Sequence, residues 1–548
     1  MSAKSAMAGV VRSITVAAGV FAPGHLGPLT QVIPFELVDA VLEENGRAER
    51  RLRMIPARVA LYLTLAMALF EPVSAFGVWD KLTGALRGVC TRPSEKALRD
   101  ARRRIGVEPL KALCEVLCGP IAQPGTPGAR YRGYRTVAFD GCSSTKIRDT
   151  PRNRALYGPP QVPEGHSGYP MLRLMTLVET GSRALIGAVF GPCSIGELAW
   201  AEQLLDRLDA SMLLLNDRGF DADDFLAKIA VTKAAFLVRA RRLRRPPVLA
   251  HLPDGSYLTL VNQLKLRVIE AKITITGADG TILTDSYRLL TTLLDHRMHP
   301  APTLAALYHE RWEIETAYLA LRHTLLDGRV LRSGDPTGLA QEMWAILTVY
   351  QALRTVMCEA AEHTPGTDPD RMSFTLALET ARTHTLLADL GDPADRLGPI
   401  GRAVLATPNP PRRARYSQRK LKSSASRYSA KDPTRPSTST PISDISIHIE
   451  PPTARPVDPL DLTAPRHRLP PAATPPHTPT PPPTKQQILA LLRQHPGQPQ
   501  RLREIAAALG ISGRLHTNRL GVRLSRWHHQ GLLTKTEPGT YMIKNTGP

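Results

Sequence analysis

The N-terminal part of the chain carries apolar residues at the spacing of α-helices. Residues 34–45 have apolar side chains every three or four positions, which predicts an amphipathic helix. The apolar run 59–70 is only 12 residues long, so it predicts a buried helix rather than a membrane span. Residues 93–104 predict an exposed basic helix. Residues 1–125 are therefore interpreted as a helical domain. Its basic face would bind DNA ends, or the domain would simply pack on a neighbouring core.

From residue 126 onward, short apolar runs alternate with turn formers and helical patterns. The predicted strands cover 136–139, 171–180, 184–191 and 212–216. The first strand ends at Asp140 and the last at Asp217, and a helical pattern at 197–208 lies between them. Strands mixed with helices predict an α/β fold class, and residues 126–217 form the first part of its core.

Residues 218–305 are rich in β-like runs. The strand-like segments are 234–239, 257–261, 266–269, 272–276 and 287–294. The sequence Gly277-Ala-Asp-Gly280 predicts a hairpin turn, and Arg239-Ala-Arg-Arg-Leu-Arg-Arg245 adds a cluster of positive charge. This block is interpreted as a β-rich insertion, after which residues 306–400 provide the second, helical part of the core.

The composition changes at about residue 401. Residues 401–484 are rich in Pro, Ser and Thr, and such a segment cannot bury a core, so it predicts a disordered linker. Periodic apolar patterns then return at 487–493, 502–511, 517–529 and 532–543. They predict helices followed by a two-stranded wing, so residues 485–548 are interpreted as a winged-helix-like module. Such a module would bind DNA or contact another protein.

Length and charge narrow the classes of partner. The chain has 548 residues, enough for more than one domain, and a formal net charge of +21. Its isoelectric point of about 10.0 favours nucleic acid, because phosphate contacts supply most non-specific affinity; a basic tail on a neutral domain is the alternative. The six cysteines lack zinc-site spacing, and the first 20 residues lack the apolar core of a signal peptide. We therefore expect a soluble cytoplasmic protein with no membrane contact.

Three acidic residues stand where carboxylates suit metal-dependent phosphoryl transfer. Asp140 and Asp217 each follow an apolar strand, and Glu315 shares a predicted helix face with Arg311 and Arg322. Taken singly, each aspartate is better explained as a turn or helix cap, and Glu315 as a salt-bridge partner of Arg311. Brought together by the fold, the three carboxylates could hold a pair of divalent cations.

Three local motifs give the chain a resemblance to a known family. The first is Ala138-Phe-Asp140-Gly141, followed by Asp149-Thr-Pro-Arg-Asn153, and the second is Asn216-Asp217-Arg-Gly-Phe220. The third contains Tyr308, Arg311, Glu315 and Arg322. Together they resemble bacterial insertion-sequence transposases of the insertion-element-four family, with Arg322 at a position where the family pattern has Lys. The similarity covers roughly residues 30–430.

The resemblance implies a fold and a set of roles. It implies an RNase H-like catalytic core interrupted by the β-rich insertion. Asp140, Asp217 and Glu315 would be the catalytic residues and would ligate two Mg²⁺ or Mn²⁺ ions. Tyr308, Arg311 and Arg322 would contact DNA phosphates near the scissile bond, and arginine at 322 keeps the charge and adds a fork that grips phosphate.

The resemblance also implies an activity. The expected enzyme is a Mg²⁺-dependent transposase that cleaves double-stranded DNA at terminal inverted repeats and joins the ends to target DNA, as a homodimer associated with the bacterial nucleoid. A catalytically inactive DNA-binding regulator and a cellular RNase H-like nuclease are the alternatives. Family members use a tryptophan of the insertion in a DNA-hairpin step, and no tryptophan lies between residues 218 and 305. The use of a hairpin therefore stays open.

Overall fold

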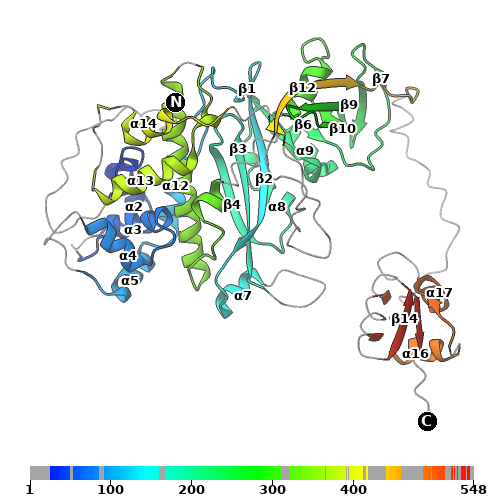
Figure 1. Ribbon diagram of the computed structural model, residues 1–548, viewed down its shortest axis with the longest axis horizontal. Coiled ribbons are helices and arrows are strands. Elements are labelled where there is room, and N and C mark those ends of the chain that lie inside the picture. The colour runs from blue at the N-terminus through cyan, green and yellow to red at the C-terminus, as the bar shows by residue number, and fades with distance from the viewer. Residues whose placement is uncertain are drawn as a thin grey trace. The chain divides into compact units, whose positions relative to one another are not determined.

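The computed structural model describes two compact units, Met1–Asp461 and Leu462–Pro548 (Figure 1). The described residues are 25–49, 53–84, 92–158, 168–309, 320–364, 366–389, 392, 394–395, 397–410, 415–416, 440–457, 485–494, 497–511, 520–521, 524, 527–528, 532–537 and 540–543. Among the helices of these residues, none combines the length and the apolar character that a membrane span requires.

Five helices form the N-terminal part of the first unit. They are α2 (Phe35–Glu44), α3 (Ala57–Leu69), α4 (Ala75–Thr83), α5 (Glu95–Ile105) and α6 (Glu108–Leu117). Helix α3 is buried on all sides because α2, α4 and α5 surround it and the long helix α12 (Pro336–Glu362) packs against it. The prediction of a buried helix at 59–70 is thus confirmed, and this domain packs on the core of the first unit.

The expectation that residues 93–104 form an exposed basic helix is only half right. Helix α5 exposes Arg99 and Arg103 on one side and buries Leu98 and Ile105 on the other. The Arg104 guanidinium donates to the Ile55 carbonyl at 2.6 Å and lies 3.1 Å from Glu49. Packing of the apolar stripe therefore turns part of the positive charge inward, which a count of basic residues does not reveal.

A mixed sheet forms the centre of the first unit. Its first six strands are β1 (Arg130–Tyr131), β2 (Tyr134–Lys146), β3 (Met171–Glu179), β4 (Leu185–Pro192), β5 (Met212–Asn216) and β6 (Ala235–Arg239). The main strands lie in the order β4-β3-β2-β5-β6, with β3 antiparallel to both β2 and β4, and with β5 and β6 parallel to β2. The predicted α/β class is confirmed.

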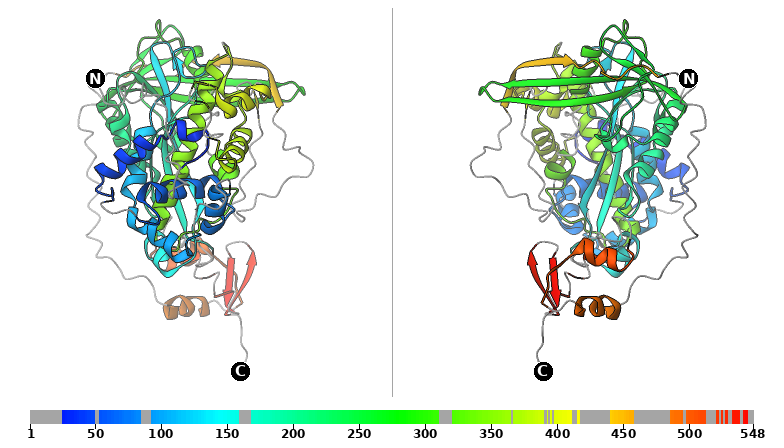
Figure 2. Two further views of the ribbon diagram at one scale, coloured as in Figure 1. Left: turned by 90° about the vertical axis from the view of Figure 1, so that its left-hand side faces the viewer. Right: turned by 90° about the vertical axis from the view of Figure 1, so that its right-hand side faces the viewer.

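The strands expected to form a separate insertion extend this same sheet. They are β7 (Ala250–His251), β8 (Tyr257–Val261), β9 (Leu264–Gly277) and β10 (Ile282–Thr291). Strand β10 pairs with β6, and the β9–β10 hairpin turns where Gly277-Ala-Asp-Gly280 predicts it, with Gly280 at a φ of +78° (Figure 2). The prediction that the insertion begins at residue 218 is wrong, because helix α9 (Asp223–Val231) is the crossover that brings β6 parallel to β5.

Part of the predicted linker is also ordered. Strand β12 (Thr440–Ile449) pairs antiparallel with β9, and the short β11 (Arg415–Tyr416) pairs with β12. Within 401–484 the linker prediction is therefore wrong for 440–449, where Ile445, Ile447 and Ile449 alternate with polar residues as a strand requires. Helix α14 (Gly398–Ala406) also runs past the predicted boundary at 400. Residues 417–439 and 458–484 lie outside the described residues.

Helices cover both faces of the sheet. On one face lie α12 and the N-terminal helices, together with α10 (Ala301–His309), the π-helix η5 (Ala320–Leu325), α13 (Phe374–Leu386) and α14 (Figure 1). On the other face lie α8 (Glu197–Glu202) and α9. Alternate residues of β2 face the two cores: Ala138 belongs to the first, and Val137 and Phe139 to the second. This alternation decides toward which side each functional residue of the sheet points.

The second unit has its own small core. Its elements are α16 (Lys485–Arg493), β13 (Gln500–Arg501), α17 (Leu502–Ala508), β14 (Leu533–Glu537) and β15 (Thr540–Ile543). The strand order is β13-β15-β14, and Ile488, Ile505, Trp527 and Tyr541 are among the residues buried beneath it. The two-stranded hairpin predicted at 532–543 is confirmed. Most of the expected recognition helix at 517–529 lies outside the described residues.

Candidate active site

The fold brings Asp140 and Asp217 side by side. Strands β2 and β5 are parallel neighbours in which Arg135 pairs with Met212 and Val137 with Leu214. The same offset of 77 positions is kept at the last residue of β5, where the Phe139 backbone N–H donates to Oδ1 of Asn216 at 3.1 Å. Continued by one position, this offset indicates that Asp140 lies opposite Asp217, and neighbouring strands are about 4.8 Å apart.

Both aspartates point toward the same face of the sheet. Residues 138 and 142 of β2 and residues 213 and 215 of β5 belong to the first core, and side chains alternate along a strand. Asp140 and Asp217 continue these two series, so they lie on the side where α10 packs. Both are partly exposed to solvent. Two carboxylates at one level and on one face form a pair of oxygen donors of the kind that Mg²⁺ and Mn²⁺ prefer.

Local backbone bonds orient the two carboxylates. Oδ1 of Asp217 accepts from the Gly219 N–H at 2.7 Å and caps the short helix η3 (Arg218–Phe220). Oδ1 of Asp140 accepts from the Gly141 N–H at 2.9 Å. A β-carbon at position 219 would stand 2.9 Å from Oδ1 of Asp217, so a larger residue there would require this carboxylate to shift. The turn alone predicts a helix cap at Asp217, and the structure shows this cap. The capping bond also holds the Asp217 carboxylate in one orientation.

Tyr308 of the third motif joins helix α10 to the same place. Its hydroxyl donates to the Asn216 carbonyl at 3.0 Å, next to Asp217, and its ring meets Tyr287 edge-on at 5.6 Å between centroids. The side chain is only 2% exposed. In this structure Tyr308 therefore docks α10 onto the end of β5, and the phosphate contact expected of it stays a prediction.

The rest of the third motif is described only in part. Arg311 and Glu315 lie within 310–319, outside the described residues, and for Arg322 in η5 only the backbone is described. Within the described residues no three His, Cys, Asp or Glu side chains come together as a metal site. The third carboxylate would have to come from the undescribed segment, which begins directly after α10.

One basic residue beside the aspartates was not singled out from the sequence. In the parallel pair β5–β6, Leu213 aligns with Ala235 and Asn216 with Val238, so the same register aligns Asp217 with Arg239. The Arg239 guanidinium lies 4.3 Å from the Tyr287 ring centroid and 3.0 Å from Asp285. The sequence signal for Arg239 is a basic residue at the end of an apolar strand. Assigning the whole cluster 239–245 to the insertion hides this signal.

The second half of the first motif has a structural task. Asn153 is fully buried, and its Nδ2 donates to the carbonyls of Arg148 at 2.9 Å and Ser333 at 3.0 Å. Thr150 Oγ1 donates to the Gly334 carbonyl at 2.8 Å. These bonds hold the segment that follows η5 against the end of β2.

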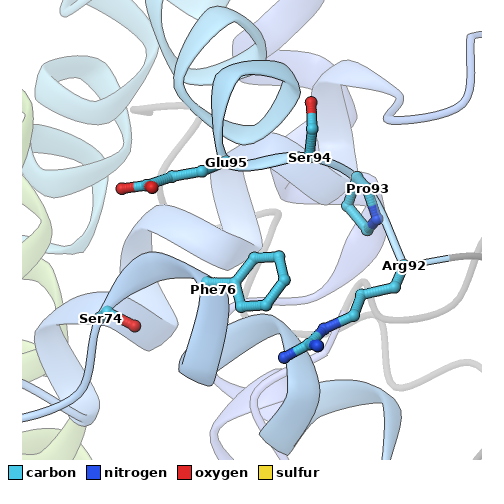
Figure 3. A pocket seen from close by; sticks show the side chains of 6 residues that line it. All are labelled: Ser74, Phe76, Arg92, Pro93, Ser94 and Glu95. Carbon is cyan, nitrogen blue, oxygen red and sulfur yellow. The ribbon is translucent and has the colours of Figure 1, made fainter.

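A separate cavity of about 660 Å³ lies in the N-terminal domain, lined by Ser74, Phe76, Arg92, Pro93, Ser94 and Glu95 (Figure 3). The Arg92 guanidinium stacks 3.7 Å from the Phe76 ring centroid and forms an ion pair with Asp80. The Arg92 guanidinium and the Phe76 ring are thus already paired with each other and with Asp80 within the domain. Neither aspartate of the pair lines this cavity.

Comparisons with known proteins agree with the motifs. Residues 23–115 match the family described as insertion element 4 transposase N-terminal, and residues 135–352 match the transposase DDE domain. Transposase InsG for insertion sequence element IS4, from Escherichia coli (strain K12), is 26% identical over 310 residues, which are 54% of this chain and 69% of InsG. A piggyBac transposase synaptic complex with hairpin DNA aligns with 76% of this chain and 87% of its own chain at 12% identity, but its TM-score of 0.33 carries no argument about the fold. The chain belongs to the insertion element 4 family of DDE transposases.

Proposed function

We propose that this transposase cleaves double-stranded DNA at terminal inverted repeats and joins the freed ends to target DNA. The observation that carries the proposal is the parallel register of β2 and β5, whose continuation brings Asp140 and Asp217 to one level and one face of the sheet. The strand order β4-β3-β2-β5-β6, with β5 and β6 parallel to β2, supports an RNase H-like core. In such a core the carboxylates meet at the sheet centre.

The proposed metal ligands are Asp140, Asp217 and Glu315. The two aspartates fit because they offer neighbouring oxygen donors that backbone bonds already orient. When bound, a pair of Mg²⁺ or Mn²⁺ ions would activate the attacking oxygen and stabilise the leaving oxygen. The protein's own task is to hold these carboxylates and the DNA phosphate in one geometry.

Arginines would hold the DNA beside this pair. Arg239 is aligned with Asp217 and 24% exposed, so its guanidinium can exchange Asp285 for a phosphate. Arg311 and Arg322 would add further phosphate contacts from the third motif. Tyr308 would keep α10 against β5 and so hold that motif near the aspartates.

The remaining parts of the chain would bind DNA away from the reacting bond. The N-terminal domain is proposed to read the element ends, and the second unit to add a further contact with duplex DNA. Residues 485–548 contain ten Lys and Arg against two Glu, which favours a polyanion over a neutral protein surface. Cutting and joining two ends together requires two active sites, so a homodimer on DNA is proposed.

The test is cleavage of DNA carrying the element end in the presence of Mg²⁺. We expect the wild-type protein to cut and Asp217→Asn to bind the same DNA without cutting. Asp206→Asn, on an exposed side chain of the same unit, is the matched control and should cut like the wild type. Binding without cutting by all three proteins would contradict the proposal and favour a DNA-binding regulator.

A further inference from the structure

Helix α10 connects two distant parts of the fold. It begins at Ala301, packs against β9 and β12, and reaches the end of β5 through Tyr308. Tyr308 lies seven positions after Ala301, which is about 10 Å along a helix axis. The start of this helix therefore sets the direction in which the chain approaches the aspartate pair.

A buried arginine holds the segment that leads into α10. Arg267, on β9, is fully buried, and its Nε donates to Oγ of Ser256 at 2.8 Å. Its Nη1 donates to the His299 carbonyl at 2.6 Å, two residues before the helix begins. Its Nη2 forms an ion pair with Asp254. One guanidinium thus ties β9, the β7–β8 turn and the approach to α10 together.

Asp254 completes this connection. The residue lies in the turn between β7 and β8, and its Oδ2 accepts from the Ala301 N–H at 2.9 Å, which is the first backbone N–H of α10. A carboxylate at this end also interacts favourably with the helix dipole. Burial raises the pKa of Asp254, but hydrogen bonds from Ser256 and Ala301 and the charge of Arg267 outweigh it and lower the pKa below its usual range. Asp254 is therefore a charged acceptor here.

We infer that Asp254 and Arg267 are positioning residues of the active site, which fix the first turn of α10 and through it the placement of Tyr308 at the end of β5, next to Asp217. This inference rests on the proposed function. Neither residue is proposed to touch the reacting DNA; they act from β9 and from the turn between β7 and β8, which gives these strands a task in catalysis besides extending the sheet. A shift of about 1 Å at a reacting group can reduce a rate about a hundredfold, so loosening this anchor should be visible in cleavage.

The experiment compares full-length wild type, Asp254→Asn and the matched control Asp370→Asn. Asp370 pairs with Arg183 at 2.8 Å, and both side chains are nearly fully buried; in the Asp254 pair the arginine is fully buried and 16% of the Asp254 side chain is exposed. That control pair joins the β3–β4 turn to the short helix η6 (Pro369–Arg371). Two quantities are measured: hydrogen–deuterium exchange of peptides covering 301–309, without DNA or metal, and single-turnover cleavage of end DNA. Exchange is measured at one interval below each protein's melting temperature.

We expect Asp254→Asn to accelerate exchange at 301–309 about tenfold and to slow cleavage about a hundredfold, with end binding within twofold of wild type. Asp370→Asn should lose thermal stability but keep wild-type exchange at 301–309. Wild-type exchange at 301–309 in Asp254→Asn, or a cleavage loss no larger than that of Asp370→Asn, would overturn the inference.

Two further arms keep the test decisive. If Asp254→Asn does not fold, Asp254→Glu takes its place, because it keeps the charge and moves the carboxylate by one methylene; the same two outcomes then apply. If the wild type itself does not cut end DNA, the proposed function fails, whereas the exchange measurement still decides whether the pair anchors α10.

Discussion

The role given to Arg239 leads to a prediction that separates catalysis from stability. Arg239→Gln removes the charge beside Asp217 and keeps a side chain of similar polarity. If Arg239 binds a DNA phosphate, the lost charge-assisted contact is worth about 2 kcal/mol, or about thirtyfold in rate. The effect should appear in single-turnover cleavage of preformed complexes with Mg²⁺.

The expected effect on folding is much smaller. The Arg239–Asp285 pair is partly exposed, with 24% and 58% of the two side chains accessible, so it contributes at most about 1 kcal/mol. The contact of the guanidinium with the Tyr287 ring adds about 0.5–1 kcal/mol. Against a typical stability of about 5–15 kcal/mol, the variant should remain folded at the assay temperature.

Asp285→Asn is the matched control, because it removes the same ion pair and leaves the arginine. Asp285→Asn should lose the stability that the ion pair contributes, as Arg239→Gln does, but should keep the contact of Arg239 with Tyr287. It should cleave at the wild-type rate or faster. A wild-type rate for Arg239→Gln would refute the phosphate contact. An equal loss in both variants would show that the ion pair, rather than a DNA phosphate, explains the requirement for Arg239.

Three further predictions concern the aspartate pair, the third motif and the second unit. Gly219→Ala should slow cleavage about tenfold or more with DNA binding unchanged, because the new methyl group would press on Oδ1 of Asp217 from 2.9 Å; a wild-type rate would show that this carboxylate can shift freely. Glu315→Gln should retain end binding in a gel-shift assay and abolish cleavage, and retained cutting would exclude Glu315 from the site. Deleting residues 485–548 should weaken DNA binding and flatten its dependence on salt; unchanged binding would make the second unit a protein-contact module.

The sequence locates the two aspartates by a local signal, because each follows a short apolar run, 136–139 or 212–216. The prediction that the first strand ends at Asp140 is wrong, because β2 runs on to Lys146 and Asp140 lies within it. The alignment of the two residues, however, depends on the offset between β2 and β5, which pairs residues 77 positions apart. No local pattern encodes that offset.

Arg239 and β12 escape prediction for the same reason. Arg239 acquires its place only because β6 lies parallel to β5, and a basic residue at a strand end looks the same in a surface hairpin. The alternating isoleucines of β12 are a genuine strand signal, but composition averaged over 401–484 hides a ten-residue exception. Averaging over long segments therefore misses strands that the distant β9 recruits.

The two halves of the proposed metal site are held by different kinds of contact. Asp140 and Asp217 are fixed within the sheet by register and by the N–H groups of Gly141 and Gly219. Helix α10 and the residues just before α12 are held instead by contacts with other elements of the first unit, and η5 between them packs on α12 and α13.

Asp254 and Arg267 hold the start of α10. After η5, the Arg332 N–H donates to Oε1 of Glu342 at 3.0 Å, while its guanidinium donates to the Met67 carbonyl at 2.6 Å. The second anchor thus belongs partly to the N-terminal domain, which is proposed to hold the element end. Since Asp140 and Asp217 are held within the sheet, a change at Asp254 or at Arg332 should displace α10 or the residues before α12 and leave the two aspartates in place.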